Sequence, residues 1–376
     1  MITAPPMSSD LRSAASPRVA DAAARAAATI AVPKSAPADS FVLHAPLELL
    51  ARVGLVPYVA PDRRDDAIAM IDRLADQYEA SGDPVAEPAP MALGDPVSAA
   101  RRLVDALGEG DLDRVDSSAD ALLSTVSFPE AAGLLAGHVI TSLAAAGHAP
   151  IGFALGARVR PALSPSLLRG ALRGIATRPD WQVRWHVDHV DNGDPNRLYE
   201  ALRSVPRLGS PGSDFIHPLM SQVQDGGLAE ALLAPVLADR FDVTGAARTL
   251  TRVAAWSMVH DDPAHAPYGW SHALTMPQAV MNLAGAGVPP RLALAVAATF
   301  TAGFRAAHSQ VDLPAVIVPG SMPDVTAAEL ATAASLHEDA HLVKFTLACL
   351  HAAADDPRYR SLYLSAALRL VTWWNA

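Results

Sequence analysis

The stretch His341-Leu-Val-Lys-Phe-Thr-Leu-Ala-Cys-Leu350 decides the fold class, because it is a helix-forming run in which apolar and polar residues do not alternate. It lies inside a longer segment, 326–354, that we expect to form one helix. Long helices are also expected at 289–309 and 358–374. Alanine and leucine dominate the sequence and aromatic residues make up 5% of it, which favours helix over sheet. The sequence therefore predicts an all-α fold, a large multi-helix bundle.

The rest of the chain follows the same pattern, with one break. Asp95-Pro96 is typical of a helix start, whereas the helical pattern stops at Trp181–His189, where a short strand is tolerated. No change in composition divides the chain, so we expect a partly mobile N-terminal arm at 1–40 and a single helical catalytic domain at 41–376. Further helices are expected at 46–55, 63–81, 95–108, 111–125, 129–147 and 165–175.

Composition and charge narrow the function classes. No apolar run reaches the roughly 20 uncharged residues that span a bilayer, and the N-terminus lacks the basic and apolar regions of a secretory signal. The net charge of −10 comes without a basic stripe, which argues against nucleic acid as a partner. We expect a cytoplasmic protein, a monomer or homodimer, that binds a small molecule and has no membrane or nucleic-acid partner.

Lys344 is the residue whose presence most needs a reason. The chain has two lysines, Lys34 and Lys344, against 27 arginines. An ammonium is costly to bury in an apolar helix, but lysine can lose its proton there and arginine cannot. The neutral amine can act as a base or react with carbon dioxide to give a carbamate, an anionic metal ligand. The alternative is that Lys344 reaches the surface or pairs with an acid such as Glu338 or Asp339.

The spacing around Lys344 favours a metal. His337, His341 and Lys344 stand four and three residues apart, which stacks side chains on one face of a continuous helix. Imidazole is the usual ligand of iron, copper, nickel and zinc. We therefore predict a metal-binding helix face, with His337 as a candidate catalytic residue and Phe345 as a candidate wall of the substrate pocket.

Several other histidines are candidates for the same chemistry. His44, His138 and His272 stand in apolar helical runs, where a hydrogen-bonded core histidine is commoner than a metal ligand. His260 is a candidate catalytic residue, and His217 with Trp270 would line the substrate pocket. No glycine-rich phosphate loop occurs, so no flavin or nucleotide is expected. Surface, cap or structural positions are expected for His148, His186, His189, His265, His308 and His351.

Four segments carry a resemblance to a known family. Phe41-Val-Leu-His44 and the helix after it are similar to an N-terminal histidine motif, and Asp339-Ala-His-Leu-Val-Lys344 is similar to an Asp-Ala-His-Val-x-Lys signature. Ser271-His-Ala-Leu-Thr275 and His138-Val-Ile140 resemble two motifs between them. Together these segments resemble the questin oxidase-like family, whose members act on anthraquinones and related polyketides.

The resemblance implies a cofactor and a ligand set. It implies Fe(II) held without flavin or 2-oxoglutarate, in a cavity of the helical bundle, with an aromatic small molecule and dioxygen as partners. It implies an oxidoreductase, an iron-dependent dioxygenase or other oxygenase that cleaves a ring oxidatively. The implied ligands are four histidines and a carboxylated lysine: His44, His138, His272, His341 and Lys344.

Three other functions stay open at this stage. A Baeyer–Villiger-like monooxygenase would need an external reductant, and a metal-dependent hydrolase would work without oxygen. A non-enzymatic helical scaffold would use the histidines as core residues and bind no metal.

Overall fold

The computed structural model describes residues 17–35, 40–91, 94–158, 168–184, 195–208, 216–237, 242–262 and 267–374. Within these ranges the regular secondary structure is helical, which confirms the predicted all-α class. The described residues contain no strand and two isolated β-bridges, Lys34 with Pro84 and Ser142 with Gln182. Of the strand tolerated at 181–189, only this bridge at Gln182 is seen, and residues 185–189 lie outside the described ranges.

The chain divides into two compact units. Unit 1 comprises Met1–Gln182 and Asn282–Pro289, and unit 2 comprises Val183–Met281 and Pro290–Ala376. The segment predicted as an N-terminal arm belongs to unit 1, and its helix packs against that unit's other helices.

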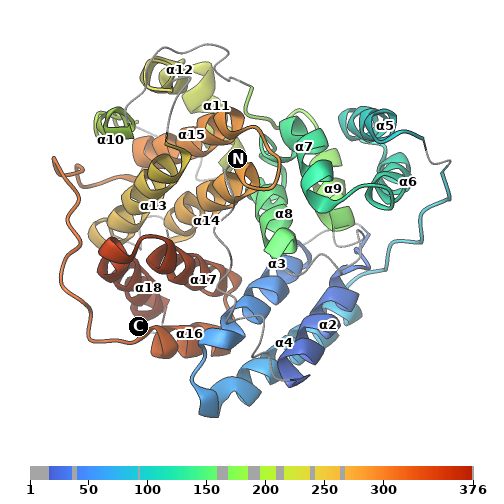
Figure 1. Cartoon of the computed structure of the whole chain (residues 1–376), viewed down its shortest axis with the longest axis horizontal. Helices are drawn as coiled ribbons and strands as arrows, with labels where there is room; N and C mark the ends of the chain where they lie inside the picture. The colour runs from blue at the N-terminus through green and yellow to red at the C-terminus, as the bar shows by residue number, and fades with distance from the viewer. Residues whose placement is uncertain are drawn as a thin grey trace. The chain divides into compact units, whose positions relative to one another are not determined.

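The first three described helices of unit 1 lie side by side, as the blue ribbons of Figure 1 show. They are α2 (Pro17–Ile30), α3 (Ser40–Leu55) and α4 (Arg64–Ala80). On α2, the buried residues Ala22, Ala26 and Ile30 are four apart and therefore share the face that packs on α3 and α4.

The stretch Ser40–Tyr58 is long and apolar enough to cross a membrane by length and composition alone. Of this stretch, 56% is buried inside the folded chain, and buried core helices of globular proteins satisfy the same criterion. The absence of a membrane partner therefore stays a prediction.

The described part of unit 1 contains five more α-helices. Helix α5 begins as predicted, because Asp95 accepts a hydrogen bond from the backbone N–H of Ser98 at 3.0 Å and Pro96 occupies the first helical position. The predicted helix at 129–147 is wrong in its second half, since α7 ends at Val139. The helices are α5 (Pro96–Glu109), α6 (Leu112–Leu123), α7 (Phe128–Val139), α8 (His148–Arg158) and α9 (Arg169–Ala176).

Unit 2 is built around α15 (Pro290–His308), in which every residue from Ala293 to His308 is buried. A Cβ atom at Gly303 would lie 2.6 Å from the sulfur of Met220, so glycine there lets α11 pack closely. The other described α-helices of unit 2 are α10 (Pro195–Arg203), α11 (Ile216–Asp225), α12 (Leu228–Leu233), α13 (Val243–His260), α16 (Ala327–Leu336), α17 (Ala340–Asp355), α18 (Arg360–Trp374) and, up to Met281, α14 (Pro267–Ala284).

The single helix predicted at 326–354 is wrong, because the structure has two helices there, α16 and α17. His337 follows α16 with extended backbone angles, φ −83° and ψ 153°. Asp339 then caps α17, since its carboxylate accepts the backbone N–H of His341 at 2.7 Å and that of Leu342 at 3.4 Å. The first N–H groups of a helix have no acceptor within the helix. The carboxylate of Asp339 provides one, and a new helix therefore begins at this point.

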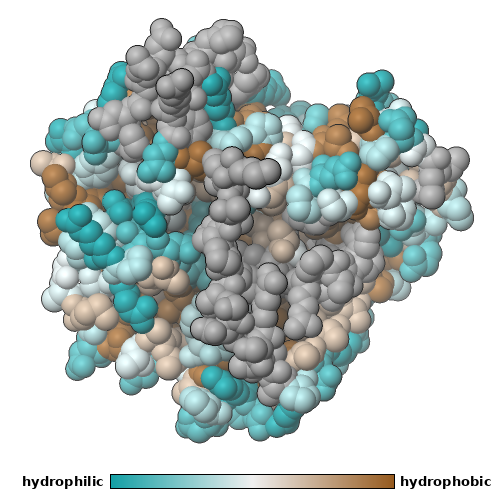
Figure 2. Space-filling view, in the orientation of Figure 1, coloured by the Kyte–Doolittle hydropathy of each residue, from teal (hydrophilic) through white to brown (hydrophobic). Residues whose placement is uncertain are grey.

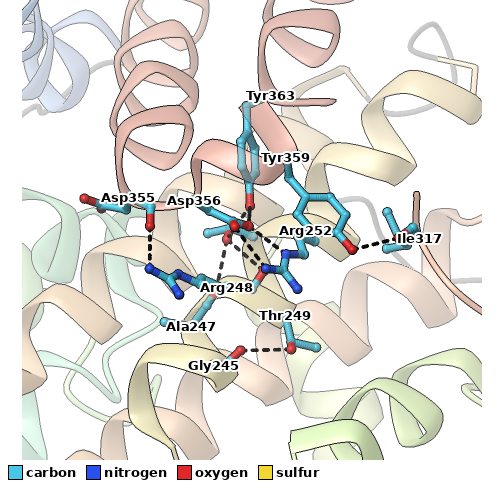
Figure 3. A network of polar contacts seen from close by, with 11 residues as sticks. Gly245, Ala247, Arg248, Thr249, Arg252, Ile317, Asp355, Asp356, Tyr359 and Tyr363 are labelled. Atoms are coloured by element: carbon cyan, nitrogen blue, oxygen red, sulfur yellow. Dashed lines mark hydrogen bonds and ion pairs between the residues drawn. The ribbon is translucent and has the colours of Figure 1, made fainter. Parts of the chain in front are cut away.

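Residues 309–326 run between α15 and α16 without regular structure, yet they are held by side chains of unit 2. The hydroxyl of Tyr359 donates to the carbonyl of Ile317 at 3.0 Å (Figure 3), and Ser361 donates to that of Pro319 at 2.5 Å. Ile317 is buried between the exposed Val316 and Val318. Figure 2 shows brown, apolar surface along the edge where Figure 1 draws this segment.

Candidate metal-binding histidine pairs

Two histidines of unit 2 meet where α14 and α17 begin. The ring centroids of His272 and His341 are 5.1 Å apart, with the ring planes at 56°. Further along, the side-chain amide of Gln278 donates to the carbonyl of Ala348 at 3.0 Å. The second contact lies toward the C-terminal end of both helices relative to the first. Helices α14 and α17 therefore run side by side in the same direction.

Lys344 lies between these two contacts on α17. Residues 341, 344 or 345, and 348 share one face of a helix, so Lys344 and Phe345 are on or near the side facing α14. Lys344 is only 5% exposed, which disfavours the alternative in which its amine reaches the surface. The other lysine, Lys34, does lie near the surface, where it donates to the carbonyl of Glu79 at 2.8 Å.

The imidazoles of the pair are oriented through Nδ1. In His272, Nδ1 is 2.7 Å from the carbonyl oxygen of Tyr268, which accepts only if the proton is on Nδ1. In His341, Nδ1 is 3.3 Å from a carboxylate oxygen of Asp339. In both residues the proton is therefore on Nδ1, and Nε2 carries the lone pair. Many metal-bound histidines have this arrangement.

Burial also favours the neutral form of His341. Burial lowers the pKa of this imidazole and the contact with Asp339 opposes the shift, while Lys344 lowers the pKa further only in its ammonium form. Burial raises the pKa of Asp339, but the side-chain and charge interactions with His341, together with the backbone N–H groups of His341 and Leu342, outweigh it and the pKa is lowered. A neutral imidazole beside an ionised carboxylate is the form that binds metals.

One aromatic ring contacts the pair, and a second contacts that ring. The ring of Tyr268 lies 4.5 Å from that of His341 in an edge contact and 5.8 Å from that of Trp374. Sequence reasoning missed Tyr268 and Trp374, although the tyrosine stands four residues before His272. The predicted pocket residues Trp270 and Phe345 are almost fully buried, and their role as pocket walls stays a prediction.

The other candidates of unit 2 have local partners. His337 accepts the backbone N–H of Asp339 at 2.9 Å, so it helps to shape the turn before α17 and does not share a helix with Lys344. His260 ends α13, with its ring stacked 4.1 Å from that of Trp256. His217 on α11 is 3.2 Å from the hydroxyl of Ser221. Their catalytic and substrate-binding roles stay predictions.

Unit 1 contains a second histidine pair. The ring centroids of His44 on α3 and His148 on α8 are 4.5 Å apart in an edge contact. His148 was expected at a surface, cap or structural position, and it is only 5% exposed. His138 on α7 is half-buried, and burial lowers the pKa of its imidazole. Among the described residues its side chain has no recorded hydrogen bond, ion pair or ring contact.

The predicted ligands are thus divided, with His44 and His138 in unit 1 and His272, His341 and Lys344 in unit 2. Among the described residues, no three or more histidine, cysteine, aspartate or glutamate side chains form a group that could hold a metal ion. No protein-family model matches the chain, and no curated protein or solved structure is significantly similar to it.

Proposed function

We propose that this chain is a nonheme iron-dependent oxygenase that acts on an aromatic or quinonoid polyketide-like small molecule, with oxidative ring cleavage as its reaction. The observation that carries the proposal is the buried Lys344 one turn after His341, whose ring lies 5.1 Å from that of His272. Lysine is costly to bury as an ammonium, and its neutral amine is the form that carbon dioxide modifies.

The spacing of His272 and His341 supports a metal ion bound by both. At a metal–nitrogen distance of about 2.0–2.1 Å, two imidazoles bound to one ion have ring centroids about 4.5–5 Å apart. His272 and His341 would hold the ion through Nε2, and Lys344, once carboxylated, through an oxygen. Ferrous iron supplies the activation of dioxygen when it is bound. His44 and His138 stay predictions of the family resemblance.

The chain's own groups would prepare this chemistry. Asp339 orients His341, and burial keeps that imidazole neutral. The packed neighbours of Lys344 exclude water from its amine, and only the unprotonated amine reacts with carbon dioxide. Tyr268, beside His341, and Trp374, beside Tyr268, offer aromatic rings for a planar substrate.

Metal analysis tests the proposal. Full-length protein reconstituted anaerobically with Fe(II) and desalted should contain about one iron per chain by plasma mass spectrometry. Lys344→Ala and His341→Ala should lose the iron while keeping parental circular dichroism. Lys34→Ala removes the other lysine and should keep it. A parent that binds no metal after reconstitution contradicts the proposed site.

Two further measurements separate the alternatives. Oxygen consumption with an aromatic polyketide and no reductant favours the oxygenase, whereas a strict need for reductant favours the Baeyer–Villiger-like monooxygenase. Zinc in place of iron, with turnover in the absence of oxygen, favours the hydrolase. Carboxylation of Lys344 predicts a carbamate ¹³C signal from ¹³CO₂ in the parent that Lys344→Ala lacks.

A further inference from the structure

The pair in unit 1 is set by close packing of two helices. His44 on α3 contacts His148 on α8, and one turn further along both helices Leu47 approaches Gly152. A Cβ atom at Gly152 would lie 3.3 Å from Cδ2 of Leu47, so the missing side chain makes room for this approach. The two rings therefore meet at a fixed place in the packing of α3 against α8.

The backbone before His148 is strained. Ala145 and Ala146 have φ values of 46° and 58°, and Gly147 follows at 72°. The left-handed region costs a non-glycine residue about 1–2 kcal/mol. Such strain persists only where the surrounding structure imposes it, and it gathers at functional sites. The strained turn leads directly into His148, which is the first residue of α8.

The tautomer of His44 suits a ligand. Its Nδ1 is 2.6 Å from the carbonyl oxygen of Ser40, so Nδ1 carries the proton and Nε2 the lone pair. A backbone carbonyl on the far nitrogen is the usual support of a metal-bound imidazole. The centroid distance of 4.5 Å to His148 also matches the roughly 4.5–5 Å expected for two imidazoles on one ion.

The two histidines share a sequence context. Each begins the tripeptide His-Ala-Pro, at 44–46 and at 148–150. The tripeptide recurs at 265–267, where His265 lies outside the described residues. The resemblance implied His138 as a ligand together with His44. His138 is not followed by Ala-Pro, and within the described ranges its ring contacts no other ring.

We propose that His44 and His148 form a two-histidine ligand pair for a transition-metal ion within unit 1, and that His148, not His138, is the partner of His44 in binding it. The inference rests on the proposed function only for the identity of the metal as iron. It extends the ligand set to a residue for which neither the spacing nor the resemblance gave a metal role.

The test compares His148→Gln and His44→Gln with a matched control, His138→Gln, in the full-length chain. Each protein is loaded with Cu(II), and pulsed electron paramagnetic resonance reports the number of coordinated imidazoles. We expect each variant of the pair to lose one imidazole and to bind Fe(II) more than about tenfold more weakly. His138→Gln should change neither quantity.

A measurement on the parent covers the case in which His148→Gln fails to fold. Histidine C2-hydrogen exchange, followed by mass spectrometry with fragmentation, should change at His44 and His148 when Fe(II) is added and stay constant at His138. The same exchange rate at His148 with and without metal would overturn the proposal.

The outcomes separate this inference from the proposed function. Stoichiometric iron in the parent, kept by His148→Gln and lost by His138→Gln, overturns the inference and leaves the oxygenase standing. Cu(II) bound through the pair in a parent that takes up no iron supports the inference and contradicts the oxygenase. A parent that binds neither metal overturns both.

Discussion

At the scale of single residues, Asp339 performs two tasks with one carboxylate. It accepts the backbone N–H groups that begin α17, and it lies 3.3 Å from Nδ1 of His341. The same carboxylate therefore starts the helix that carries Lys344. It also orients the imidazole of His341, which lies one turn before Lys344. A capping residue that also supports a ligand ties helix formation to the geometry of the site.

The two tasks respond differently to substitution. Asparagine caps a helix about as well as aspartate, so Asp339→Asn should leave the urea midpoint nearly unchanged. It removes the negative charge beside His341, and Fe(II) affinity should fall by about 10- to 100-fold, as for other residues that support metal ligands. Asp339→Ala should lose the cap as well, at a cost of about 1 kcal/mol in stability. Parental metal affinity in Asp339→Asn would show that this carboxylate only caps.

At the scale of elements, the turn between α7 and α8 departs from what the sequence favours. The helix predicted at 129–147 does not continue through this alanine-rich stretch, and Ala145 and Ala146 take left-handed angles instead. The packing of His148 against His44 lies directly after this turn. Tertiary contacts therefore outweigh the local preference of alanine for the right-handed helix.

Relief of this strain is measurable. Ala146→Gly should stabilise the protein by up to about 1 kcal/mol, because glycine adopts positive φ freely but loses more entropy on folding. Ala154→Gly, in the interior of α8, should instead destabilise it by about 1 kcal/mol. Urea denaturation followed by circular dichroism at 222 nm compares the two. A loss of stability in Ala146→Gly equal to that of the control would argue against the left-handed turn.

At the scale of the whole molecule, a buried polar network holds α13 and α18 of unit 2 together (Figure 3). Asp356 accepts two hydrogen bonds from Arg252, at 2.6 and 3.0 Å, and one from the hydroxyl of Tyr363 at 3.0 Å. The guanidinium also lies 3.9 Å from the ring centroid of Tyr359. Burial tends to lower the pKa of Arg252, but the contacts with Asp356 outweigh it and the pKa is raised.

Removal of this carboxylate should weaken unit 2. Asp356→Ala leaves Arg252 and Tyr363 without their acceptor, at a cost of about 2–4 kcal/mol, below that of a fully buried pair because Arg252 is about a quarter exposed. Asp312→Ala breaks the exposed pair with Arg207 and should hardly move the midpoint. Tryptophan fluorescence in urea follows the change, since every tryptophan except Trp181 belongs to unit 2. Equal midpoints for both variants would contradict this role.

The sequence by itself determined the helical class and many helix boundaries. Composition and local signals suffice for this, because a cap such as Asp95 acts on N–H groups within the next turn. Lys344 also stands out from the sequence, since a rare lysine in an apolar run is unusual whatever packs against it. The break at Asp339 carries a capping signal, but the long apolar pattern around it favours one continuous helix, and the prediction there is wrong for that reason.

Only the tertiary structure paired His44 with His148, and His341 with His272 and Tyr268. Residues in each pair come from helices that are far apart in the chain, and no local rule relates their positions. The strained turn before His148 likewise depends on packing that opposes local preference. The residue types in the sequence limit which side chains can bind a metal, whereas the packing of helices decides which of them meet, because contacts between helices depend on the whole fold.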